Sequence, residues 1–193
     1  MNPLPAASAE TAIQIDEAQG RFRVARSMYV DPAVHQAEME AIFNRCWLFV
    51  GHDSELAGPN AFITRTIAGR SLIFVRDSNG EVRCLLNVCP HRGAQVVRQR
   101  SGVARTFSCI YHGWGFENTG RNLHIAERDT YAAGFDRPGC NDLVAAPRFE
   151  QYRGLWFVNF DPQAPSLHDY LGQAREYIDI IFDQAEQGMK VVG

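Results

Sequence analysis

The fold of this chain depends on two stretches, Asn87-Val88-Cys89-Pro90-His91-Arg92-Gly93-Ala94 and Cys109-Ile110-Tyr111-His112-Gly113-Trp114. Each stretch carries one cysteine and one histidine close together, and a glycine follows shortly after each histidine. Seventeen residues separate His91 from Cys109. Glycine lets a backbone turn tightly and approach a bound group. We therefore expect two short loops that present the same two ligand types to one site.

Thiolate and imidazole in equal numbers form the ligand set of a Rieske centre. In such a centre two cysteines hold one iron of a [2Fe–2S] cluster and two histidines hold the other. The pattern predicts that Cys89 and Cys109 bind one iron and that His91 and His112 bind the other. The cluster is the predicted cofactor, and no catalytic residue is predicted in this chain.

Two other interpretations of these four residues stay open. Tetrahedral zinc takes the same donors, although zinc fingers usually pair cysteine with cysteine and histidine with histidine. The four residues could also be unrelated members of the core, because free cysteine is often buried. Both pairs lie in glycine-containing loops, with cysteine and histidine two or three positions apart, which favours the iron–sulfur site over both alternatives.

Residues beside the ligands are predicted to shape the site, namely Arg92, Gly93, Tyr111, Gly113 and Trp114. Trp114 is expected either to cover the cluster or to pack in the core. Tyr111 is expected either to hydrogen-bond to nearby backbone or to serve only as an amphipathic side chain that fills space. Four arginines suit either a docking patch for an acidic electron donor or a solvated basic face: Arg92, Arg98, Arg100 and Arg105.

Composition sets broad limits on the chain. Its 193 residues are 46% hydrophobic and 21% charged, as in a globular protein with a real core. The net charge of −3 argues against a general nucleic-acid binder. No apolar run reaches the length of about eighteen residues that indicates a membrane span, and the first residues lack a secretory signal. Cys46, Cys84 and Cys140 form an odd remainder, which favours a reducing cytoplasm.

The order of patterns predicts a small antiparallel β-sandwich with two cluster-binding loops, mainly β with flanking helices. Residues 1–20 are expected to be a mobile tail, and 21–46 a helical segment that begins at Asp31-Pro32 and ends near Arg45. Residues 47–162 form the cluster domain, with an Asn79-Gly80 turn of type I′ and a hairpin turn at Arg153-Gly154. The predicted strands are 62–67, 71–76, 82–88, 105–108, 115–117, 122–123, 143–149 and 155–160. A helix over 166–187 opens a further segment, 163–193.

The sequence resembles the large (α) subunits of Rieske-type aromatic ring-hydroxylating dioxygenases. The resemblance rests on the two ligand stretches and on Tyr29-Val30-Asp31-Pro32, Phe74-Val75-Arg76-Asp77 and Tyr152-Arg153-Gly154-Leu155-Trp156-Phe157-Val158. It covers about residue 21 to the end of the chain. The family usually has proline where this chain has Ile110, a spacer position between the ligands.

The resemblance implies an oxidoreductase that hydroxylates aromatic rings in hydrocarbon catabolism. It implies a reductase or ferredoxin as electron donor, and trimers of α subunits with possible β subunits. The family's second domain binds a mononuclear Fe(II) through two histidines and a carboxylate, and no such constellation follows Gly113 here. We therefore expect the Rieske portion of such a subunit, not competent for catalysis alone. The alternative is a free-standing Rieske ferredoxin, which does not need the N-terminal helix or the helical end.

Overall fold

A computed structural model describes residues 12–192, and it divides them into two compact units with the boundary between Cys46 and Trp47. No helix among the described residues is both long enough and apolar enough to cross a lipid bilayer. The predicted limits of the mobile tail and of the segment after residue 162 stay predictions, and residues 1–11 of that tail lie outside the described residues.

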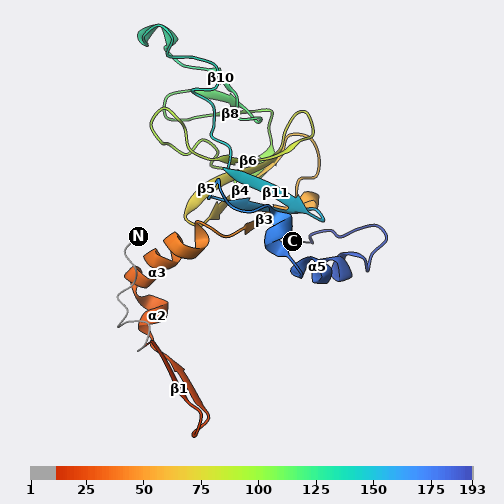
Figure 1. Ribbon diagram of the computed structural model, residues 1–193. Helices are drawn as coiled ribbons and strands as arrows, with labels where there is room; N and C mark the ends of the chain where they lie inside the picture. Colours follow the sequence, from red (N-terminus) through yellow and green to blue (C-terminus); the bar gives the residue numbers. More distant parts are fainter. Residues whose placement is uncertain (1–11, 193) are drawn as a thin grey trace. The chain divides into compact units, whose positions relative to one another are not determined.

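The first unit begins with a hairpin and continues with short helices (Figure 1). Strand β1 (Ile13–Asp16) pairs antiparallel with β2 (Arg21–Val24). The sequence pattern predicts no strand before residue 20, and here the structure differs. Strand prediction from sequence relies on apolar side chains that become buried, and those of this hairpin are exposed. Ile13 is 49% exposed, Ile15 66% and Phe22 65%.

Helix α2 (Ser27–Val30) precedes α3 (Pro32–Glu38), which continues directly into a π-helical turn, η1 (Met39–Phe43). The carboxylate of Asp31 accepts a hydrogen bond from the Ala33 amide at 2.8 Å, and Pro32 occupies the first helical position. An N-cap carboxylate and a proline at the first helical position are the two signals that predict the helix start. The predicted beginning of this helix is therefore confirmed.

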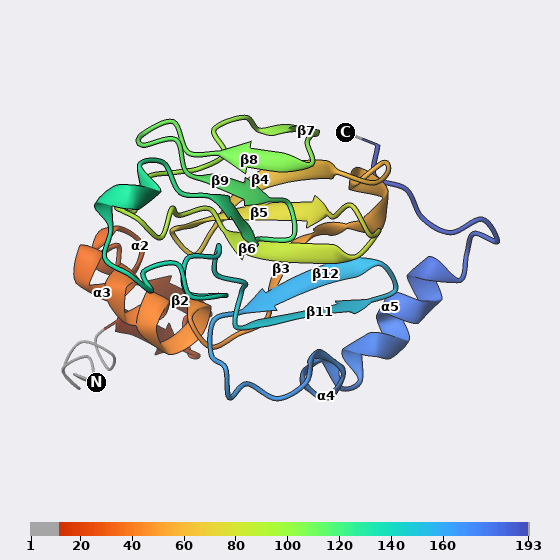
Figure 2. The same ribbon diagram turned by 90° about the horizontal axis from the view of Figure 1, so that it is seen from above.

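The second unit holds three antiparallel sheets (Figure 2). The central sheet has the order β6-β5-β4-β7, from β4 (Ala61–Ile67), β5 (Arg70–Arg76), β6 (Val82–Leu86) and β7 (Ser101–Val103). A second sheet joins β11 (Arg148–Tyr152), β12 (Leu155–Asn159) and β3 (Leu48–His52). The third joins β10 (Asn122–His124), β9 (Gly115–Glu117) and β8 (Thr106–Ser108). This architecture confirms the predicted fold class.

Strand β5 lies between two hydrophobic cores. Leu72 and Phe74 belong to the core shared with β3 and β12, whereas Ile73 and Val75 belong to the core shared with β8 and β9. All four side chains are completely buried. Successive side chains of a strand point to opposite faces, so a continuous apolar run is what a strand covered on both faces requires.

Tight turns set the hairpin registers. Arg153 (φ 55°) and Gly154 (φ 79°) both have left-handed backbone, which makes the predicted turn there a two-residue type I′ loop. The type I′ turn predicted at Asn79-Gly80 is wrong. Only Gly80 there has a positive φ, and its amide donates to the Asp77 carbonyl at 3.1 Å. That is a type I turn followed by a glycine bulge.

The end of the chain forms two helices in place of the single helix predicted over 166–187. Helix α4 (Leu167–Leu171) is capped by the Ser166 hydroxyl, and α5 (Ala174–Phe182) follows it. Gly172 separates them with φ 48° and ψ −126°, a conformation open to glycine and incompatible with a continuing helix. The predicted start and apolar periodicity are right, and the break was missed.

Candidate metal centre

The two ligand loops repeat the same backbone geometry. In each loop the cysteine amide donates to the carbonyl five residues further on at 2.8 Å. In each loop the glycine amide donates back to the cysteine carbonyl at 2.9 Å, from Gly93 to Cys89 and from Gly113 to Cys109. Both glycines have φ +73°, where any other residue is strained. The glycines predicted beside the ligands are therefore required by the turns themselves.

Sheet strands position these loops. The first loop leaves the end of β6, and the second connects β8 to β9. Asn87, which is 1% exposed, holds the first loop from inside. Its side chain donates to the Val97 carbonyl at 2.7 Å and accepts from the amides of Val97 and Val96 at 2.8 and 3.1 Å. The loop is thus anchored by buried hydrogen bonds rather than by solvent-exposed contacts.

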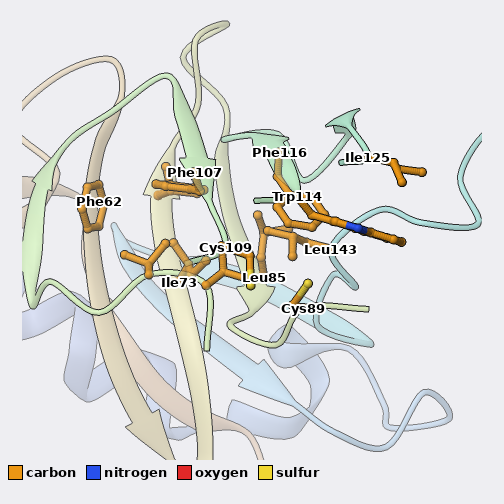
Figure 3. Close-up of a cluster of buried hydrophobic side chains, with 13 residues drawn as sticks. Phe62, Ile73, Leu85, Cys89, Phe107, Cys109, Trp114, Phe116, Ile125 and Leu143 are labelled. Atoms are coloured by element: carbon orange, nitrogen blue, oxygen red, sulfur yellow. The ribbon is translucent and has the colours of Figure 1, made fainter. Parts of the chain in front are cut away.

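Both predicted cysteine ligands are buried, each 2% exposed, within the hydrophobic core shown in Figure 3. Their side chains belong to the same buried cluster, close enough for the Cys109 thiol to affect the ionisation of the Cys89 thiol. Burial and this neighbouring thiol raise the pKa of Cys89, while the backbone amides of His91 and Arg92, which point at its sulfur, oppose the rise. Burial and the negative charge of a neighbouring thiolate both oppose ionisation of a thiol. Two adjacent thiols in a core therefore require a positive ion before both become thiolates.

The two predicted histidine ligands meet each other as well. The ring centroids of His91 and His112 lie 4.5 Å apart with an interplanar angle of 67°. Burial, followed by the charges of His112 and Arg92, lowers the pKa of His91 from its ordinary value. A lowered pKa keeps the imidazole neutral, and a neutral imidazole is the form that binds metal.

The four ligand residues therefore lie as two pairs, thiol with thiol and imidazole with imidazole, each pair drawn from both loops. Within residues 12–192 no group of three or more Cys, His, Asp or Glu side chains is placed to hold a single ion. Two irons bridged by sulfide, one held by two thiolates and one by two imidazoles, match this pairing. The residues present fit a Rieske cluster better than a single zinc ion.

Aromatic side chains enclose the histidine pair. Trp114, 1% exposed, stacks on His91 with ring centroids 4.9 Å apart and an interplanar angle of 3°. It is part of the core and also stacks on a predicted ligand, and its role as a cover for the cluster stays a prediction. Its indole Nε1 is buried without a hydrogen-bond partner. Tyr111 is 59% exposed and lies against His112, with ring centroids 3.8 Å apart.

Sequence reasoning missed a further residue at the site. Tyr131 lies on the segment after β10, and its hydroxyl is 3.4 Å from Nε2 of His91. No motif or periodicity surrounds Tyr131, so the sequence held no signal for it. The four arginines of the predicted docking patch, Arg92, Arg98, Arg100 and Arg105, are all exposed, and their role stays a prediction.

Comparison with known proteins agrees with this geometry. Residues 46–135 match the Rieske [2Fe-2S] domain. The chain is 35% identical over 183 residues to the large subunit of 2-halobenzoate 1,2-dioxygenase from Burkholderia cepacia, covering 94% of this chain and 39% of that protein. It is 36% identical to the α subunit of biphenyl 2,3-dioxygenase from Rhodococcus jostii, covering 96% of this chain and 40% of that protein.

The crystal structure of naphthalene 1,2-dioxygenase from Rhodococcus sp. superposes with a TM-score of 0.82 at 38% identity, over 88% of this chain and 39% of that one. The chain thus spans about two fifths of the length of the relatives it matches. Similarity extends on both sides of the matched domain, over nearly all of this sequence. Residues 46–135 therefore form a Rieske [2Fe-2S] domain, and nearly the whole chain is similar to the N-terminal Rieske portion of aromatic ring-hydroxylating dioxygenase large subunits.

Proposed function

We propose that this chain is the electron-transfer part of the oxygenase component of an aromatic ring-hydroxylating dioxygenase. Cys89 and Cys109 hold one iron of a Rieske cluster, and His91 and His112 hold the other. The observation that carries the proposal is the pairing of thiol with thiol and imidazole with imidazole across two loops that share the same backbone hydrogen bonds. The bound cluster supplies a carrier for one electron at a time.

The surrounding residues divide the site into a dry side and an accessible side. The cysteine side chains are 2% exposed, so water is excluded from the sulfur ligands. The histidines are only half-buried, which leaves their edges as the contact through which an electron enters or leaves. Cys89 and Cys109 also pack in a core built on β5, and a rigid sheet fixes the distance between the two loops.

The residues beside the ligands favour a low reduction potential. Ala94 and Tyr111 occupy positions where high-potential Rieske proteins carry additional cysteines, and Trp114 stands where those proteins carry a serine that hydrogen-bonds the cluster. Fewer hydrogen bonds to the sulfur atoms destabilise the reduced, more negative cluster. We place the potential in the lower part of the Rieske range of about −150 to +300 mV.

A complete oxygenase needs more than this portion. We propose a reductase or ferredoxin as the electron donor, with the exposed side chains of Arg92, Arg98, Arg100 and Arg105 contributing to its docking surface. We also propose a mononuclear Fe(II) in the full-length protein and a trimer of α subunits with β subunits. Five free cysteines, of which Cys140 is exposed, support a reducing cytoplasm as the location. The alternative, a free-standing ferredoxin, is disfavoured because the likeness to oxygenase subunits extends well beyond residues 46–135.

Electron paramagnetic resonance of the anaerobically reduced chain tests the proposal, with iron and acid-labile sulfide counted on the same sample. We expect a rhombic signal of low average g and equal amounts of iron and sulfide, two of each per chain, as a [2Fe–2S] centre requires. Cys109→Ser should abolish the signal, whereas Cys140→Ser, at an exposed cysteine, should leave it unchanged. A silent spectrum with bound zinc and no sulfide would refute the proposal.

A further inference from the structure

His91 is surrounded by aromatic side chains on several sides. Trp114 stacks flat on one face of its imidazole. Tyr131 meets the same ring at a steep angle, with centroids 6.3 Å apart and an interplanar angle of 79°. Tyr131 also contacts Trp114 edge-on, with centroids 6.2 Å apart. The orientation of the His91 ring is therefore constrained both from its face and from its edge.

The hydroxyl of Tyr131 lies against one particular atom, Nε2 of His91, at 3.4 Å. An imidazole that binds a metal through one ring nitrogen usually donates its other N–H to an acceptor, which fixes the ring and raises the basicity of the ligand. With Tyr131 at Nε2, Nδ1 is left for the iron. In the part of the chain that the structure describes, no hydrogen bond reaches the ring of His112, so the two histidines are not equivalent.

The segment that carries Tyr131 is held in place by its own contacts. It follows a 3₁₀ turn, η3 (Arg128–Thr130), and the Tyr131 amide donates to the Arg128 carbonyl at 3.2 Å. Phe135 stacks on the Tyr131 ring, with centroids 4.3 Å apart and an interplanar angle of 19°. An ion pair between Arg128 and Asp136 joins the two ends of the segment.

We propose that Tyr131 is a positioning residue for the cluster: its hydroxyl accepts the Nε2–H of His91, while its ring, supported by Phe135, closes the Trp114 side of the site. This inference rests on the proposed function, because it takes His91 as an iron ligand. The loop after β10 therefore helps to set the reduction potential of the cluster, in addition to connecting two sheets.

The sign of the effect follows from the direction of the hydrogen bond. A neutral imidazole bound through Nδ1 carries its proton on Nε2, so Nε2–H donates and the tyrosine oxygen accepts. Acceptance makes the imidazole a stronger donor to iron, and stronger donation favours the oxidised cluster over the reduced one. Tyr131 therefore lowers the reduction potential, and removal of its hydroxyl should raise it.

The test is the reduction potential of the purified 193-residue chain carrying Tyr131→Phe, measured by redox titration of the cluster signal. We expect the equilibrium to shift about threefold toward the reduced form, the scale of one modest hydrogen bond. At about 59 mV per tenfold for a one-electron couple, this is a rise of roughly 28 mV. The g-values should also shift, because one ligand ring is no longer fixed at its edge.

Tyr152→Phe is the matched control. It removes one hydroxyl that bonds to Asp179 at 2.8 Å, in another sheet, and should leave the potential and the g-values unchanged. A cluster present in both proteins with the same potential in wild type and Tyr131→Phe would overturn the inference and leave the proposed function intact. Absence of the cluster signal from the wild type would instead overturn the proposed function itself.

Discussion

At the scale of single residues, the Asn87 side chain fixes the first ligand loop. It bonds the backbone groups of Val96 and Val97 that a neighbouring strand would otherwise bond. Asn87→Ala should lower the free energy of unfolding by about 2–4 kcal/mol, because two loop amides and a carbonyl lose buried partners. Urea denaturation measures this change. The control is Gln95→Ala, which removes an exposed donor to the same Val97 carbonyl at 3.0 Å and should cost less than about 0.5 kcal/mol. Equal losses in the two variants would contradict this account.

The sequence identifies some site residues and not others, for a physical reason. Cys89 and Cys109 could be predicted as ligands because few residue types bind iron and because each lies two or three positions before a histidine. Asn87 stands inside the same motif, yet its hydrogen bonds join residues nine and ten positions apart, which no local pattern encodes. Tyr131 reaches His91 over forty residues through a loop without periodicity. Such a contact becomes visible only in the folded chain.

At the scale of elements, the turn from β5 to β6 depends on one buried carboxylate. Burial of Asp77 raises its pKa, but hydrogen bonds from the Arg83 guanidinium and the amides of Asn79 and Glu81 outweigh burial and hold the pKa below its ordinary value. The Asn79 and Glu81 amides donate to Asp77 Oδ1 at 2.8 and 3.0 Å, and Arg83 Nε donates to Oδ2 at 2.5 Å. A lowered folded-state pKa stabilises the fold above the unfolded pKa of about 4.

Asp77→Asn should therefore destabilise the chain at pH 7 by about 1.5–3 kcal/mol, the range for a hydrogen bond to a charged group. The difference between wild type and variant should shrink as pH falls below about 4, because protonation then removes the same charge from the wild type. Unfolding curves at a series of pH values measure this. Glu117→Gln, in a half-exposed pair with Arg121, is the control and should cost less stability at pH 7. A difference that stayed constant down to low pH would count against the role of the Asp77 charge.

Elements follow from the sequence where local pattern and tertiary environment agree. The run Leu72 to Val75 predicts β5 because burial on both faces demands an unbroken apolar stretch. Strand β3 was missed because Gly51 and His52 end its short apolar run, and its place is set by pairing with β12. Gly51 is needed there, since a Cβ would come within 2.8 Å of the Phe74 ring. Long-range pairing of this kind leaves little trace in a local window.

At the scale of the whole molecule, the second unit places the candidate metal centre at the edge of one core, and a second core stabilises the other face of the central sheet. The β5 strand takes part in both cores, so the loops that carry the predicted ligands pack on a strand with four completely buried side chains. A site that exchanges electrons without rearrangement needs ligands that do not move. The fold meets this need by anchoring both loops in one hydrophobic cluster (Figure 3).

The last helix, α5, is only partly packed against the rest of its unit. One side of α5 is fixed to the sheet, since Asp179 accepts the Tyr152 hydroxyl and Phe182 packs near His52 at a ring distance of 6.0 Å. The other side exposes Tyr177 (70%), Ile180 (62%) and Ile181 (51%). Adjacent exposed apolar side chains of this size favour association. The chain by itself should therefore form dimers or larger species as its concentration rises.

Sedimentation velocity over a range of concentrations measures this association, and Ile180→Lys should shift the chain toward the monomer. Val103→Lys replaces a side chain that is 76% exposed on β7, away from the helix, and should leave the association unchanged. The cluster signal should be the same in both variants, because neither residue lies in the ligand loops. A chain that sediments as a monomer at every concentration would show that this face of α5 does not associate, whereas an equal response to both substitutions would place the association elsewhere.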